Sequence, residues 1–96
     1  MAEYIFLMHD DAVSDDEAWT PYIRKLQQDG FFDGGSGIGD GVCAKKSGAP
    51  VAVTAHLTGY IRVRAESLDQ ARSLLDGNPL FEAGGTVELR ELPRTD

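Results

Sequence analysis

The residues best suited to proton-transfer chemistry stand at the end of the first apolar segment. His9 follows the run Tyr4 to Met8 and is itself followed by Asp10 and Asp11. Histidine titrates near neutral pH, and a carboxylate beside it orients the ring and raises its pKa, as a general acid or base requires. Adjacent strand residues point to opposite faces, so Asp10 reaches the His9 ring only if the strand has already turned into a loop. Asp11, or a carboxylate from a second chain, is the alternative partner. The structural alternative is a histidine that hydrogen-bonds local backbone.

The second histidine, His56, precedes a later apolar segment and could face the same cavity as His9. The alternative is a loop histidine in solvent. If both rings converged with Asp10 or Asp11, the group would suit a divalent metal ion. No Cys or His pair has zinc-site spacing, however, so no metal site is predicted.

Two aromatic residues and three arginines are candidates for substrate binding. Trp19 and Tyr22 could form the wall of a pocket between a helix and the sheet, although aromatics at helical spacing are more often core residues. The arginines, whose planar forks suit a carboxylate or enolate, are Arg62, Arg64 and Arg90. Alternatively, Glu88 pairs with Arg62 or Arg90 across neighbouring strands.

Composition limits the class of protein. The chain has 96 residues, with 42% hydrophobic and 26% charged, which suits one globular domain spanning residues 1–96. A net charge of −7 would repel a phosphate backbone, so nucleic acid is not an expected partner. No apolar run approaches the roughly 20 residues of a membrane span, and no secretion signal is evident. A single cysteine, Cys43, cannot form an internal disulfide, and a cytoplasmic protein is expected.

The first half of the chain predicts a strand, a helix and an irregular glycine-rich segment. A strand is expected over Glu3 to Met8. Ser14 with Glu17 matches a capping box, so a helix should begin near Asp15 and end at Gly30. Within it, either Pro21 kinks the helix or Thr20 caps a shorter one. Beyond it, the expected elements are a bulged strand through Gly37 to Lys45 and a turn at Lys46 to Ala49.

The second half predicts two further extended segments and a second helix. Val51 to Ala55 and Gly59 to Ala65 look extended and form either one bent strand or an interrupted pair. Ser67 with Gln70 repeats the capping box, and Gly77 with Pro79 should end that helix. The alternation over Thr86 to Leu92 predicts a half-buried last strand.

The resulting order is β, α, β, β, α, β, the ferredoxin-like α+β arrangement, with an antiparallel sheet and both helices on one face. The first strand is apolar at both parities, because Ile5 and Leu7 alternate with the residues of the other face. The uncovered face therefore favours a homodimer in which two copies face each other through their open sheet faces. That face would also carry polar groups.

Several stretches resemble the YCII-related (DGPF) family: EYIFLMHDD, LQQDG, GYIRVRAESLDQARSLL and NPLFEAGGTVELREL. The resemblance covers most of the chain and is weakest from Phe31 to Leu57. It implies a dimeric α/β barrel, two ferredoxin-like units facing sheet to sheet, and an uncharacterised enzyme that, in some members, uses a His and Asp dyad.

The sequence departs from that family at two motifs. The Asp-Gly-Pro-Phe signature would precede Gly59, where this chain reads VTAHLTGY. The helix histidine of another branch, counted back from Gly30, falls on Trp19. The polar residues that members place at the end of the first strand correspond here to His9 and Asp10.

The sequence thus leads to a hypothesis of a cofactor-free enzyme that acts on a small organic molecule, anionic or aromatic. His9, assisted by Asp10, would be the acid or base, and the arginines would stabilise the negative charge of the substrate. The alternative is a non-catalytic dimeric module that binds a small molecule or assists a larger pathway.

Overall fold

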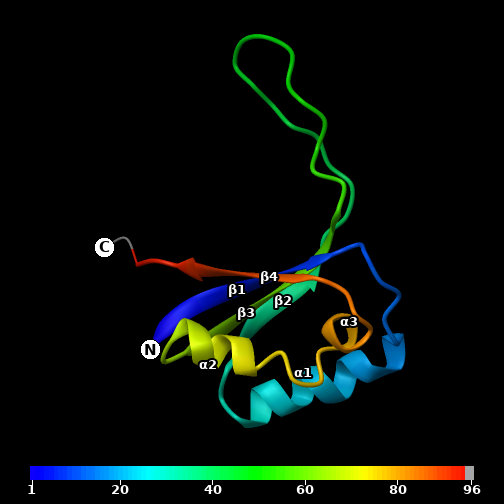
Figure 1. The fold of residues 1–96 in the computed structure, drawn as a ribbon. Helices are drawn as coiled ribbons and strands as arrows, with labels where there is room; N and C mark the ends of the chain where they lie inside the picture. Colours follow the sequence, from blue (N-terminus) through cyan, green and yellow to red (C-terminus); the bar gives the residue numbers. More distant parts are fainter. Residues whose placement is uncertain (95–96) are drawn as a thin grey trace.

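The computed structural model describes residues 1–94 and contains a four-stranded antiparallel sheet in the order β2-β3-β1-β4 (Figure 1). The strands are β1 (Ala2–His9), β2 (Phe32–Gly37), β3 (Leu57–Ala65) and β4 (Val87–Leu92). The helices, which lie together on one face of the sheet, are α1 (Trp19–Gln28), α2 (Leu68–Ser73) and α3 (Pro79–Glu82), with a 3-10 turn η1 (Asp16–Ala18) before α1. The ferredoxin-like α+β prediction is confirmed.

The core lies between the sheet and the helices. On the helix-covered face, Tyr4 and Phe6 of β1 lie opposite Val63 and Ile61 of β3, and these four residues and Met8 are buried. Burial of such side chains, at about 25 cal/mol per Å² of apolar surface, is the main force holding the helices to the sheet. From α1 through α3, the buried hydrophobic residues of the core are Tyr22, Leu26, Ala71, Leu75 and Leu80, with Leu75 in the turn between α2 and α3. Within residues 1–94, no helix is long and apolar enough to cross a membrane.

The opposite face of the sheet carries the other parity of β1. Ile5 lies between Arg62 of β3 and Arg90 of β4, and Leu7 lies between Tyr60 and Glu88. Both aliphatic residues are only half-buried. The prediction of an open face with mixed apolar and polar side chains therefore agrees with the register.

The start of the first helix differs from the prediction. Asp15, and not Ser14, caps η1, because its carboxylate accepts a hydrogen bond from Glu17 N at 3.0 Å. Pro21 is the third residue of α1. The first N–H groups of a helix have no partner within it, so Pro21 fits the first turn, and neither a kink nor a cap by Thr20 is needed.

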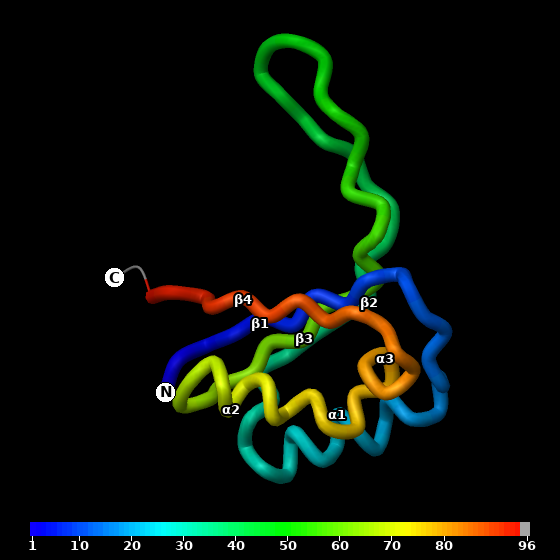
Figure 2. Tube along the Cα trace, in the orientation of Figure 1, coloured from blue at the N-terminus to red at the C-terminus, as the bar shows by residue number. Residues whose placement is uncertain are grey.

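The middle of the chain contains less strand than expected. β2 ends at Gly37, and residues 38–56, which we name the arm, contain no helix or strand. The strands predicted over Gly37 to Lys45 and Val51 to Ala55 are therefore wrong. Of the two extended segments predicted in the second half, only Gly59 to Ala65 pairs in the sheet, within β3. Alternating valines favour a strand only where a sheet or core covers one side, and the arm runs out from the body (Figure 2).

The second helix begins as predicted and ends earlier. Ser67 accepts a hydrogen bond from Gln70 N at 3.1 Å, which confirms the cap. Pro79 opens the additional helix α3 and does not simply end the preceding one. The buried Asn78 side chain caps α3 by accepting from Leu80 N and Phe81 N, both at 3.1 Å.

Candidate functional site

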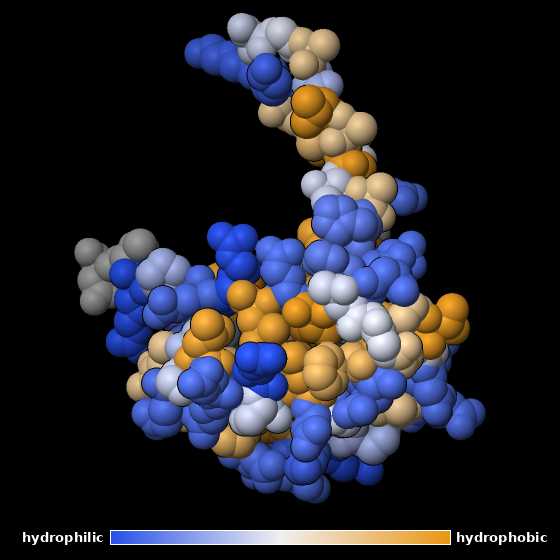
Figure 3. Space-filling model, in the orientation of Figure 1, coloured by the Kyte–Doolittle hydropathy of each residue, from blue (hydrophilic) through white to orange (hydrophobic). Residues whose placement is uncertain are grey.

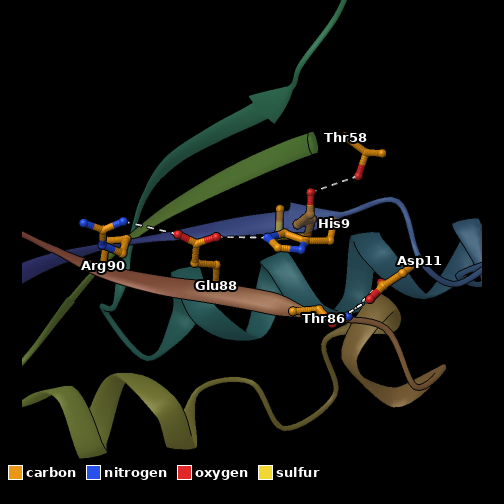
Figure 4. A network of polar contacts seen from close by, with 7 residues as sticks. His9, Asp11, Thr58, Thr86, Glu88 and Arg90 are labelled. Atoms are coloured by element: carbon orange, nitrogen blue, oxygen red, sulfur yellow. Dashed lines mark hydrogen bonds and ion pairs between the residues drawn. The ribbon is translucent and has the colours of Figure 1, made fainter. Parts of the chain in front are cut away.

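His9 and Glu88 form a hydrogen-bonded couple on the open face, where β1 ends and β4 begins. The Nε2 atom of His9 lies 3.0 Å from Oε1 of Glu88 (Figure 4). Leu7 is in register with Glu88, so His9, two residues later on the same face, is its diagonal neighbour. The backbone N–H of His9 also donates a hydrogen bond to the backbone oxygen of Thr86 at 3.0 Å, which fixes the end of the strand. The couple is half exposed to solvent, with side-chain exposures of 22% for His9 and 38% for Glu88.

Glu88 is held as a carboxylate from two sides. The hydrogen bond from His9 and a second from Arg90, whose Nη1 lies 3.3 Å from Oε2, together keep the pKa of Glu88 below its ordinary value. A carboxylate fixed against an imidazole selects the tautomer in which Nε2 carries the proton. Nδ1 of His9 is then the nitrogen available to a substrate.

His56 converges with His9, a point that the sequence left open. The two ring centroids are 4.8 Å apart and the planes are nearly perpendicular, at 70°. The backbone brings them together, because Asp10 N donates to His56 O at 2.7 Å. The edge-on ring covers one side of His9 and adds a second titratable group to the same corner of the sheet.

The two aspartates after His9 have different roles from those predicted. The carboxylate that contacts His9 belongs to Glu88 and not to Asp10. A register shift between Met8 and His9 marks the end of the strand, and the Asp10 side chain is exposed. Asp11 accepts hydrogen bonds from the hydroxyl and the backbone N–H of Thr86, and these bonds lower its pKa. Asp11 thus ties the loop after β1 to the start of β4.

The convergence of the two histidines does not extend to a metal site. Within residues 1–94, no three His, Cys, Asp or Glu side chains gather closely enough to hold a metal ion.

A cavity of about 510 Å³ opens between α1 and the ends of β2 and β3. Trp19 and Ile23 of α1, Met8 of β1 and Phe32 of β2 supply its apolar wall, together with glycine backbone from β2 and β3. Two of these glycines allow β2 and β3 to approach closely: a Cβ on Gly35 would lie 2.7 Å from Tyr60 O, and one on Gly59 would lie 3.2 Å from Ser36 O. This volume is within the range of small-molecule sites. His9 does not line it, so the histidine pair and the cavity are separate features at the same end of the sheet.

Of the two aromatic candidates, Trp19 lines this cavity and Tyr22 does not. Trp19 Nε1 donates to Ser14 Oγ at 3.4 Å, which fixes the indole at the cavity mouth. Tyr22 is buried in the core, where its hydroxyl donates to Leu74 O at 2.8 Å. Burial raises the pKa of Tyr22 to about 12.

The three arginines are engaged in ion pairs on the open face. Arg62 lies 3.2 Å from Glu3 and 3.5 Å from Asp33, and Arg64 lies 2.8 Å from Asp33. Arg90 pairs with Glu88 along the same strand, β4, and not across neighbouring strands as predicted, and Arg62 does not contact Glu88. These contacts favour a structural role for Arg62 and Arg64, as partners of carboxylates on the sheet. Substrate binding by the arginines stays a prediction.

Sequence reasoning missed two groups that the fold places at this end of the sheet. The sequence indicates Glu88 only as an arginine partner, and Thr86 only as part of a strand. A signal for Glu88 is present, because it has the face parity of the arginines, and β4 borders β1 in the predicted ferredoxin-like order. The exact register is what the sequence does not supply.

Comparison with known proteins shows the fold and no closer relationship. No protein-family model matches the chain. No curated protein matches it either. Among solved structures, it is similar to 5-chloro-2-hydroxyhydroquinone dehydrochlorinase (TftG) from Burkholderia phenoliruptrix AC1100, in complex with 2,5-dihydroxybenzoquinone. That similarity has a TM-score of 0.56 at 12% identity and covers 97% of this chain and 95% of the other. At that identity, the likeness supports the ferredoxin-like fold, and the YCII-related resemblance stays a prediction.

Proposed function

We propose that this protein is a cofactor-free enzyme of the YCII-related type that moves a proton on a small organic substrate, anionic or aromatic, with His9 as the acid or base. The observation that carries the proposal is the 3.0 Å contact between His9 Nε2 and Glu88 Oε1. A histidine held in one tautomer by a carboxylate, and still partly exposed, has the two properties that general acid–base catalysis needs.

The residues of the couple have distinct roles in this proposal. Nδ1 of His9 takes a proton from a carbon acid of the substrate and later returns a proton to the same carbon. Glu88 positions the ring and stabilises its protonated form, and Arg90 holds Glu88 in place. His56 covers the ring of His9 and limits the directions from which a substrate can approach.

A small aromatic substrate is supported by analogy with the structural neighbour. TftG carries the name of a dehydrochlorinase of a hydroxylated aromatic ring and was solved with a dihydroxyquinone. Such a ring has acidic positions from which a histidine can remove a proton. A homodimer through the open face would enclose the couple, which would strengthen its electrostatic interactions by excluding water.

Hydrogen–deuterium exchange tests the proposal because it follows proton transfer directly, whatever product the reaction yields. A panel of small hydroxylated aromatics and carboxylic acids, including 2,5-dihydroxybenzoquinone, is incubated with protein in D₂O and followed by proton NMR. For a compound whose exchange the wild type accelerates, we expect His9→Asn to lower the rate about 10²-fold or more. Glu88→Gln should lower it less, because the ring remains.

The control for this experiment is Val13→Ala, a change at a side chain that is 94% exposed and outside the couple. It should leave the exchange rate unchanged. If the His9→Asn protein kept the wild-type rate, His9 would not be the catalytic group and the proposal would fail.

A second candidate function is a non-catalytic module that binds a small molecule at the cavity beside Trp19. The observation that favours it is the separation of the cavity from His9, which does not line it. Trp19 is the only tryptophan in the sequence, so tryptophan fluorescence reports on ligands that bind beside this side chain. A compound that changes this fluorescence saturably, binds equally well to the His9→Asn protein and undergoes no exchange would support the binding module over the enzyme.

A further inference from the structure

The arm, residues 38–56, is large for a connection between neighbouring strands. It leaves the sheet at Gly37 and returns at Leu57, and Figures 1 and 2 show it running far out from the body. The radius of gyration is 14.8 Å, whereas a compact domain of this length has about 12.5 Å. Loops of this length without secondary structure are uncommon in small domains and usually have a function.

The arm carries four exposed aliphatic side chains, two of which are mostly exposed. Ile38, Val42, Val51 and Val53 are 39%, 89%, 77% and 46% exposed. In Figure 3, apolar residues are visible along the arm, away from the body. Flexible linkers are typically rich in glycine, serine and charged residues and lack such side chains. Four exposed aliphatic residues on one projecting segment therefore indicate a surface that a partner covers.

The direction of the arm indicates where that partner lies. The helices cover one face of the sheet, and the arm projects on the opposite side (Figure 1). That open face contains the half-buried Ile5 and Leu7. A molecule that covered the open face would therefore lie beside the arm and could contact its valines.

The charge of the arm favours a second copy of this chain as that partner. The arm carries Lys45 and Lys46 against a single carboxylate, Asp40, whereas the whole chain has a net charge of −7. A positive segment on one copy is thus attracted to the acidic body of another. The open face is also complementary to itself in charge, because it carries arginines and carboxylates side by side.

We propose that the arm of one protomer clasps the body of a second copy, with its valines packed on the partner and its lysines facing the partner's acidic surface. The inference rests on the homodimer proposed above and adds the element that stabilises it. Each protomer contributes one arm, so the contact occurs twice in a two-fold dimer.

Sedimentation equilibrium of the full chain tests the clasp. We expect the double variant Val42→Asp, Val51→Asp to raise the dimer dissociation constant at least tenfold, because each change places a charge in an apolar contact and adds repulsion from the acidic body. Both side chains are exposed within one chain, so far-UV circular dichroism should be unchanged. Val13→Asp, a matched change at an exposed valine outside the arm, should alter the constant less than twofold.

Cys43, the only cysteine of the chain, provides a second measurement on the arm itself. Its reaction with a maleimide should slow as the wild-type protein is concentrated through the dimer transition, and should not slow in the double variant. A dimer of unchanged affinity in the double variant would overturn the clasp and leave the homodimer standing. A wild-type protein that stays monomeric at 100 µM, roughly the upper range of dissociation constants for a stable dimer, would overturn both the clasp and the homodimer. That result would indicate that a different protein binds the arm.

Discussion

The imidazole of His9 and the carboxylate of Glu88 meet across neighbouring strands, 3.0 Å apart, although 79 positions separate them in the chain. The contact depends on the antiparallel register of β1 and β4, which places the two side chains on the open face. It also accounts for the lowered pKa of Glu88, whose largest cause is the hydrogen bond from His9.

The first prediction concerns that pKa. Removing the imidazole in His9→Ala should raise the pKa of Glu88 toward its ordinary value of 4.5, and Arg90→Ala should raise it by a smaller amount. Carbon-detected NMR of the side-chain carboxyl group, titrated from pH 2 to 7, roughly the range in which carboxyls ionise, measures it. Arg62→Ala is the control, because Arg62 lies on the same face and pairs with Glu3 and Asp33 instead. An unchanged Glu88 titration in His9→Ala would contradict the assigned contact.

The second prediction concerns stability in acid. Asp11 has a pKa below its ordinary value of 3.8 because Thr86 donates two hydrogen bonds to it. A carboxyl with a lowered folded-state pKa stabilises the protein above the unfolded value, and this contribution is lost as the pH falls through the folded value. We expect Thr86→Val, which removes the hydroxyl bond, to flatten the fall in unfolding free energy between pH 4 and pH 2, roughly the window set by that pKa. Urea unfolding at a series of pH values measures this, and curves that run parallel would count against it.

The third prediction concerns stability in alkali. The pKa of Tyr22 rises from 10.0 to about 12 on folding, mainly through burial. A raised pKa leaves stability intact below the unfolded value, so the loss should occur as the pH rises from 10 to 12, by about 2 to 3 kcal/mol. In Tyr22→Phe this loss of stability at high pH should disappear. The free energy of unfolding at neutral pH should fall by about 1 kcal/mol, because the hydrogen bond to Leu74 O is lost. Urea unfolding of the wild type and Tyr22→Phe at pH 7 and at roughly pH 11 tests whether the wild type loses more stability than the variant as the pH rises.

The fourth prediction concerns the glycines of β2. A methyl group on Gly35 would lie 2.7 Å from Tyr60 O, a backbone atom that the strand pairing holds in place. Gly35→Ala should therefore destabilise the fold by about 1 to 3 kcal/mol, the usual range for overpacking. Gly39→Ala is the matched control, because nothing lies within 4 Å of its Cβ position. Equal thermal midpoints for the two variants would show that β2 can shift to accept the methyl group.

The sequence predicted the sheet because local patterns and burial agree there. The alternation of Ile5 and Leu7 with buried neighbours in β1, and the cap at Ser67, depend on near neighbours in the chain. In the arm, Val51 and Val53 are β-branched, but no sheet or core packs against them. Their preference for a strand is therefore not enough to form one.

The candidate site was predicted only in part. His9 was found because its chemistry can be recognised alone, and its place at the strand end was correct. Its partner was not found, because the contact with Glu88 depends on register between strands that are distant in sequence. The convergence of His9 and His56 likewise depends on a bulge at the end of β1, a feature that composition does not specify.

The glycine-rich strand β2 also has a consequence for solubility. As an edge strand, it offers unpaired backbone groups to any other strand, which is the usual route to edge-to-edge aggregation. Here, that edge is short, is interrupted by a register shift between Phe32 and Gly35, and carries the charged Asp33. β2 is therefore a poor template for strand addition, which lowers the tendency of this edge of the sheet to recruit foreign chains.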